Sequence, residues 1–384
     1  MFHFILHKTN IAFFVFVFIN FIFSVKYLSR ITDYFLVISL VISLIYILIW
    51  RFKLLLKKFY PQLYLLNIFI LLLFIVVSLF LFYVIPVETL NVDRWSIINS
   101  FWDTYFSGGY AYYGRGHTGN PPGPMPFYFI LALPFYAIGE LGLYSLLGIF
   151  AFYFMMRYSK FSNDLQTIGI ILIALSSFYL WEIVSRSNTF INAALIVFSL
   201  IYILKQKMFS TKKIIGIGVL IGLLLSTRNV FIIPYIIAFL FIWRTKRIRF
   251  KQLILLGFIS LIVFIITFLP FVLGHFEDFK IINPFLIQSS FLIPFGYTVF
   301  FIVLAIFLSL LCKKNADVYF YSGITLFISI SIYFLYHSKH SGFYTTYFES
   351  AGDISYFILC TPFLLYFILT GLNQNAESKP IIEY

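Results

Sequence analysis

Long apolar runs separated by short polar segments cover most of this chain. A helix needs about 20 apolar residues to cross the hydrocarbon core of a bilayer, with a range of roughly 17–25. The pattern therefore predicts an all-α polytopic bundle with about 12 crossings, placed at 10–25, 31–50, 61–86, 141–157, 165–184, 189–204, 213–227, 229–243, 252–273, 291–312, 317–336 and 354–372.

Basic residues decide how the awkward apolar stretch 126–138 is interpreted. If this stretch does not cross, most of the 27 Lys and Arg fall in loops on one side, including the cluster 244–251. Cytoplasmic loops carry such an excess, so both termini and the tail 373–384 are predicted inside. The stretch 126–138 is then expected to be a juxtamembrane helix at the outer face, where acids and bases are mixed.

Composition agrees with a membrane protein and excludes other classes. Hydrophobic residues make up 62% of the chain and charged residues 11%, which rules out a soluble globule and a disordered chain. The net charge of +13 is explained by topology and does not indicate nucleic acid. Cys312 and Cys360 lie in apolar runs, so no disulfide framework and no thiolate metal site is predicted. The prediction is a single integral domain, 1–384, in the plasma (inner) membrane.

The longest polar stretch, residues 87–125, is predicted to be an outer loop. Within it, 93–106 shows the apolar spacing of an amphipathic helix lying at the membrane interface, ended by Gly108-Gly109. A Tyr- and Gly-rich turn follows and leads to Pro121-Pro122. An acid, an interfacial helix and a polar turn thus come directly after a span, which makes this loop the candidate catalytic segment.

These features resemble the first outer loop of the GT-C superfamily, polytopic glycosyltransferases that use sugars carried on polyprenyl phosphate. The resemblance covers roughly 85–240 and is carried by "NVDRW", "NPPGPMPFYF", the Ser-Arg-Ser-Asn at 185–188 and "GVLIGLLLSTRNVFIIP". It implies that Asp93 is the catalytic acid–base group, acting on a lipid-linked donor and a glycan, lipid or protein acceptor. Two features depart from the family pattern, because three spans precede the loop and Asp93 is followed by Arg94.

Sugar transfer from a lipid phosphate needs a carboxylate to take the acceptor's proton and cations to hold the leaving phosphate. Asp93 is the predicted base. Glu182 precedes Arg186 by four residues, which predicts a structural ion pair between them. No cofactor and no metal are predicted. The predicted phosphate- or substrate-binding residues are Arg94, Asp103, Arg115, His117, Asn120, Arg186, Arg228, His337, Lys339 and His340.

The last outer segment, 337–353, is predicted to be a loop in which His337, Lys339 and His340 face the lipid phosphate. Two other functions stay open. An O-antigen-type polymerase would need a large late outer loop, whereas 275–290 and 337–353 are short. A transporter or flippase of lipid-linked sugars would place ionisable groups at the middle of several spans, and these spans are nearly free of them.

Overall fold

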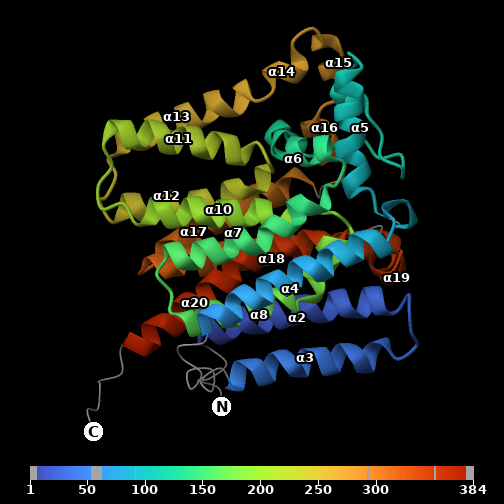
Figure 1. Cartoon of the computed structure of the whole chain (residues 1–384). Coiled ribbons are helices and arrows are strands. Elements are labelled where there is room, and N and C mark those ends of the chain that lie inside the picture. The colour runs from blue at the N-terminus through green and yellow to red at the C-terminus, as the bar shows by residue number, and fades with distance from the viewer. Residues whose placement is uncertain (1–6, 53–62, 91, 292–293, 350–351, 378–384) are drawn as a thin grey trace.

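The computed structural model describes residues 7–52, 63–90, 92–291, 294–349 and 352–377. The described residues form helices and contain no β-strand, which confirms the predicted all-α class. Residues 61–62 and 292–293, at the edges of two predicted spans, and residues 378–384 of the predicted tail lie outside this described part. Most of the helices run side by side in one bundle (Figure 1).

The helix bounds follow the apolar runs closely. Proceeding along the chain, the α-helices are α2 (Lys8–Leu28), α3 (Phe35–Phe52), α4 (Leu63–Val84), α5 (Arg94–Phe106), α6 (Pro126–Ile138), α7 (Gly142–Tyr158), α8 (Asn163–Ala174), α9 (Ser177–Val184), α10 (Thr189–Leu204), α11 (Thr211–Leu225), α12 (Ile232–Arg244), α13 (Phe250–Ile266), α14 (Leu269–Val272), α15 (Phe276–Ile281), α16 (Pro284–Phe291), α17 (Phe295–Leu311), α18 (Asn315–Ser341), α19 (Phe343–Tyr347) and α20 (Thr361–Glu377). Short 3-10 turns occupy η2 (Val87–Thr89), η3 (Ala111–Tyr113), η4 (Asn229–Phe231) and η5 (Ile354–Cys360).

Five segments are long and apolar enough to cross a bilayer: Lys8–Leu28, Leu63–Val84, Phe250–Val272, Asn315–Ser341 and Ile354–Asn373. The number rises to seven if each of two bent helix pairs, α6–α7 and α8–α9, counts as one span. The chain is therefore an integral multi-pass membrane protein. The figure of about 12 crossings also uses helices shorter than 18 residues, such as α10, α12 and α17, and it stays a prediction.

The predicted cytoplasmic loops gather at one end of the bundle. Lys8 at the start of α2 forms an ion pair of 2.6 Å with Asp317 at the start of α18. Arg247, between α12 and α13, donates to the carbonyl of Leu204 at 3.0 Å and to the Asn315 side chain at 3.1 Å. We call this the basic end. These contacts join loops that the charge pattern had assigned to one side.

The opposite end carries the long polar loop. Helix α5 lies across the ends of the bundle helices (Figure 1), as predicted for 93–106. Helix α6 is bent by 119° relative to α7, so the apolar pieces 126–138 and 142–158 do not form one continuous helix. The Phe101 and Phe129 rings stack at 3.7 Å, and Trp102 donates to the Phe129 carbonyl at 3.2 Å. Buried aromatic contacts thus fix α5 on α6.

Two helices extend beyond their predicted boundaries, at opposite ends of the bundle. Helix α18 continues to Ser341, so His337, Lys339 and His340 lie on its last turns and not in a loop. The reason is local, because no glycine or proline lies between residues 324 and 341, and the helix stops before Gly342, which has φ 83°. Helix α20 likewise runs to Glu377, beyond the predicted start of the tail at 373.

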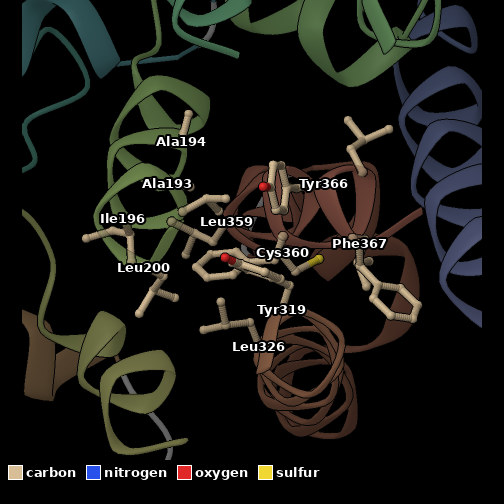
Figure 2. Packing of buried hydrophobic residues seen from close by; sticks show 14 of the residues in the cluster. Ala193, Ala194, Ile196, Leu200, Tyr319, Leu326, Leu359, Cys360, Tyr366 and Phe367 are labelled. Carbon is tan, nitrogen blue, oxygen red and sulfur yellow. The ribbon is translucent and has the colours of Figure 1, made fainter. Parts of the chain in front are cut away.

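The bundle core lies where α10, α18 and α20 meet. Ala193 and Ala194 of α10 let this helix approach closely, and Tyr319 and Leu359 fill the space between the helices (Figure 2). These side chains are buried. In a bilayer, close packing of small and large side chains holds helices together where no hydrophobic effect operates between them. This core holds together the helices that carry the polar end.

Candidate functional site

Asp93 is held in one orientation at the start of α5. Its Oδ2 accepts hydrogen bonds from the Thr118 hydroxyl at 2.8 Å and from the Asn120 side-chain amide at 2.6 Å. The chain turns tightly beneath it, because a Cβ on Gly116 would lie 3.1 Å from the Asp93 Cβ. Among the described residues nothing hydrogen-bonds to Oδ1 of Asp93, so one carboxylate oxygen faces outward with its lone pairs available.

His117 fastens this turn to α5. Its ring Nδ1 and its backbone N–H both bond the Ser96 hydroxyl, at 2.8 and 3.1 Å, and its Nε2 lies 3.1 Å from the Leu90 carbonyl. The ring also stacks on Trp95 with centroids 5.6 Å apart. His117 therefore holds the loop that carries Thr118 and Asn120 next to Asp93.

Arg94 points in the opposite direction, into the end of the bundle. Its guanidinium, 13% exposed, forms an ion pair with Asp353 and bonds the Ser355 hydroxyl at 2.7 Å. It also lies 5.5 Å from the Tyr356 ring centroid. Burial alone would lower the pKa of Arg94, but the Asp353 charge outweighs it and raises that pKa, while Arg94 in turn lowers the pKa of Asp353.

Arg228 is a second buried cation at this end. It is 9% exposed and lies 5.6 Å from the ring centroids of both Tyr128 and Tyr356. Within the described part of the chain its Nε and Nη2 have no hydrogen-bond partner. The Met125 and Tyr128 backbone N–H groups bond carbonyls of the α11–α12 loop, which holds α6 and Arg228 together. Two guanidinium groups thus share the Tyr356 ring.

Glu182 and Asn188 complete this group from the α9–α10 region. Glu182 is fully buried; its Oε1 accepts from the Phe190 backbone N–H at 2.6 Å, and in the described structure its Oε2 has no partner. Neither side-chain polar atom of Asn188 has a partner there either. Glu182 interacts electrostatically with both Arg94 and Arg228. A buried polar atom left unbonded costs about 1–3 kcal/mol, so five such atoms in one place call for an explanation. We call the whole group the outer polar cluster: Arg94, Tyr128, Glu182, Asn188, Arg228, Asp353 and Tyr356.

Arg186 lies elsewhere. It adopts φ 51°, is 2% exposed, and donates to the carbonyls of Phe82 at 3.0 Å and Ile85 at 3.1 Å, which close the end of α4. Its acidic neighbour is Glu140 at 3.5 Å. The predicted Glu182–Arg186 ion pair is wrong, because α9 ends at Val184 and the left-handed turn at Arg186 directs its side chain away from Glu182.

Asp103 and Arg115 also lie away from the outer polar cluster. Asp103 is exposed and accepts a hydrogen bond of 2.6 Å from Tyr136 of α6. Arg115 is exposed, and it donates one long hydrogen bond of 3.5 Å to the neighbouring Gly114 carbonyl. The structure therefore places Asn120 and His117 beside Asp93 and directs Arg94 into the bundle toward Asp353, and it leaves Asp103 and Arg115 outside both groups.

The α18 residues divide in the same way. The His337 ring lies 4.5 Å from the Tyr333 ring, which is 5.8 Å from Tyr356, so His337 sits one layer behind the cluster. Lys339 and His340 are exposed, and His340 Nδ1 lies 2.8 Å from the carbonyl four residues earlier. Neither Lys339 nor His340 joins Arg94 and Arg228.

Sequence reasoning missed five members of the outer polar cluster as site residues: Tyr128, Glu182, Asn188, Asp353 and Tyr356. An acid inside an apolar helix was a usable signal for Glu182. Asp353 follows a polar segment, and the two tyrosines are indistinguishable from the rest of the 28 in the chain. Among the described residues, no group of three or more His, Cys, Asp or Glu could hold a metal ion.

Two apolar hollows lie away from these groups. One, of about 430 Å³, is lined by Pro294, Gly296, Tyr297, Phe300 and Ile332 between α17 and α18. The other, of about 290 Å³, is lined by Leu195, Phe198, Ser199, Tyr202, Leu220 and Leu224 between α10 and α11.

No family model matches the sequence, and no curated protein or solved structure matches it either.

Proposed function

We propose that this protein is a glycosyltransferase that moves a sugar from a polyprenyl-phosphate-linked donor to a glycan, lipid or protein acceptor. One observation carries the proposal. Asp93 presents a free carboxylate oxygen at the start of α5, and the next residue, Arg94, places its guanidinium in a buried cluster with Arg228. A base and an anion-binding pair of arginines are thus adjacent at one end of the bundle.

The reaction follows from these roles. The acceptor hydroxyl oxygen attacks the anomeric carbon, and Oδ1 of Asp93 takes its proton. The bond between the anomeric carbon and the phosphate oxygen breaks, and its electron pair stays on the phosphate as polyprenyl phosphate leaves. Arg94 and Arg228 stabilise the charge that develops on this phosphate, since guanidinium groups bind phosphate through two parallel N–H donors.

Thr118 and Asn120 act on Asp93 and not on the substrate in this scheme. Both donate to Oδ2, so they fix which oxygen faces the acceptor. Holding a base in one orientation avoids reorganisation during the reaction. This supports assigning Oδ1 as the proton acceptor.

The proposal places this site at the extracytoplasmic face, opposite the basic end. Single cysteines at Lys280 and Lys251, both exposed, test the assignment with a membrane-impermeant thiol reagent on intact cells. Lys280→Cys is expected to react and Lys251→Cys to react only after permeabilisation; the native cysteines are buried and give little background. Reaction of Lys251→Cys in intact cells would show that the orientation in the membrane is opposite to the proposed one.

Transfer of a labelled sugar from a polyprenyl phosphate donor to membrane acceptors tests the activity itself, with the purified protein reconstituted in liposomes. A glycosyltransferase releases free polyprenyl phosphate together with the transferred sugar. A transporter would instead move the intact donor across the bilayer and leave the sugar–phosphate bond unbroken, and that outcome would refute the proposal.

A further inference from the structure

The outer polar cluster contains a gap between a buried acid and two arginines. Glu182 interacts electrostatically with Arg94 and Arg228, yet both arginines stay beyond the 4.0 Å that defines an ion pair with it. Glu182 Oε1 is bound by the Phe190 N–H at the start of α10, and Arg228 lies near the Tyr128 and Tyr356 rings. Because the fold keeps the acid and the arginines apart, their remaining hydrogen-bonding atoms are available to a ligand.

The unused atoms have a mixed character. Arg228 Nε and Nη2 are donors, Glu182 Oε2 is an acceptor, and Asn188 supplies both a donor and an acceptor. A fully ionised phosphate accepts hydrogen bonds but has none to donate, so it would leave the Asn188 side-chain oxygen unpaired. Glu182 and Asn188 together therefore do not match phosphate. A sugar hydroxyl both donates and accepts, so it matches the Glu182 carboxyl group and the Asn188 amide at once.

We infer that Glu182 and Asn188 form a hydroxyl-binding subsite that recognises the sugar of the donor, while Arg94 and Arg228 hold its phosphate. This inference rests on the proposed function. Tyr128, which also interacts electrostatically with Glu182 and Arg228, supplies an aromatic wall for the sugar ring. The Arg94 and Asp353 side chains, 13% and 35% exposed, form the partly open rim. The ligand class is therefore a sugar ring with at least one free hydroxyl next to its phosphate-bearing carbon.

Glu182→Gln is a selective change at this subsite. The glutamine carbonyl can still accept the Phe190 N–H, so the local fold is kept, and its NH₂ group then replaces the free acceptor Oε2 by a donor. Asn188→Ala removes the second pair of buried polar atoms, together with the interaction between the Asn188 side chain and Tyr128. Glu140→Gln is the matched control, because Glu140 is a half-buried acid of the same end that contacts Arg186 and not the outer polar cluster.

The experiment measures binding to the full-length protein in nanodiscs. The probes are undecaprenyl phosphate alone and undecaprenyl phosphate carrying glucose, mannose, galactose, N-acetylglucosamine or arabinose. The wild type is expected to bind at least one sugar-bearing lipid about tenfold or more tightly than the bare lipid, the factor typical of a hydrogen bond to a charged group. Glu182→Gln and Asn188→Ala should remove this difference and leave binding of the bare lipid unchanged.

The outcomes separate the two proposals. If both variants keep the full sugar-dependent gain, or lose bare-lipid binding equally, the subsite assignment is overturned. The same holds if no sugar improves wild-type binding. If the wild type binds neither the bare nor the sugar-bearing lipid, the proposed function itself fails. A gain that disappears in Glu182→Gln and persists in Glu140→Gln supports the subsite.

Discussion

Replacing Asp93 by asparagine tests the catalytic assignment in a way that the local geometry makes specific. Two donors, the Thr118 hydroxyl and the Asn120 amide, converge on Oδ2 of Asp93. In Asp93→Asn the carbonyl oxygen must occupy this position, since an NH₂ group there would face two donors. The NH₂ group then points where Oδ1 was, so the variant keeps both hydrogen bonds and loses only the proton-accepting oxygen.

The size of the effect follows from this substitution. General base catalysis contributes about 10²–10⁴ to a rate, so the kcat of transfer should fall by a factor in that range. Donor binding should be unchanged, because Arg94 and Arg228 are untouched. Thr118→Val removes one of the two bonds that orient the carboxylate and should lower kcat about tenfold with little change in KM, whereas Thr118→Ser should restore it.

The assay is single-turnover transfer from a labelled polyprenyl phosphate sugar in proteoliposomes, combined with thermal unfolding of each variant. Asp103→Asn is the matched control, because Asp103 is an exposed acid of the same helix whose partner is Tyr136. It should lose little activity. Transfer by Asp93→Asn at the wild-type rate would refute the assignment, and equal losses in both variants would remove the special role of Asp93.

Three further changes test other parts of the structure. Arg228→Gln should weaken polyprenyl phosphate binding about tenfold or more at nearly unchanged stability. Arg186→Gln should instead lower the unfolding free energy by about 1.5–3 kcal/mol, because that guanidinium binds carbonyls at the end of α4. Equal shifts of the unfolding temperature in the two variants would contradict this contrast. Gly222→Ala should destabilise the protein by about 1–3 kcal/mol, because its Cβ would lie 2.5 Å from a carbonyl oxygen of α13. Gly216→Ala, whose Cβ meets open space, should stabilise the protein by roughly 0.5–1 kcal/mol. Stability changes of the same sign in both variants would be inconsistent with the α11–α13 packing. The Arg94 guanidinium holds the pKa of the Asp353 carboxyl below its ordinary value of 3.8. The stability that this ion pair contributes is therefore complete at neutral pH and is lost as the pH falls through the lowered pKa. Asp353→Asn should reduce the fall in unfolding free energy at acid pH, and an unchanged pH dependence would count against the ion pair.

The sequence predicted the helices well, because their signal is local. Apolar runs, proline and glycine positions and the distribution of basic residues are properties of neighbouring residues, and they indicated the all-α class, the shared basic end and the helix at 94–106. The errors were equally local. The end of α18 was placed too early because polar residues at 337–341 resemble a loop, although nothing before Gly342 breaks the helix.

The candidate site was predicted only in part, because it is assembled from distant segments. Asp93, His117 and Asn120 lie within one loop and were found together. Arg186 and Arg228 look alike in the sequence, since each follows an apolar helix. Arg186 donates three hydrogen bonds to backbone carbonyls, two of them at the end of α4, whereas both Nε and Nη2 of Arg228 lack a partner among the described residues. Which of two such arginines is free depends on helix ends and packing that no local pattern encodes.

The contrast between these two arginines also explains why the outer polar cluster is expected to have a function. Arg186 shows that this fold can hold a buried guanidinium with three hydrogen bonds to backbone carbonyls and a neighbouring acid, which leaves only its Nε without a hydrogen bond among the described residues. Leaving Arg228, Glu182 and Asn188 unsatisfied therefore does not follow from a shortage of partners at this end of the protein. Such groups lower stability unless a ligand completes their hydrogen bonds, and a site built in this way binds its ligand without first breaking contacts of its own. This loss of stability is thus expected for a preorganised binding site, and the site lies at the same end of the bundle as Asp93.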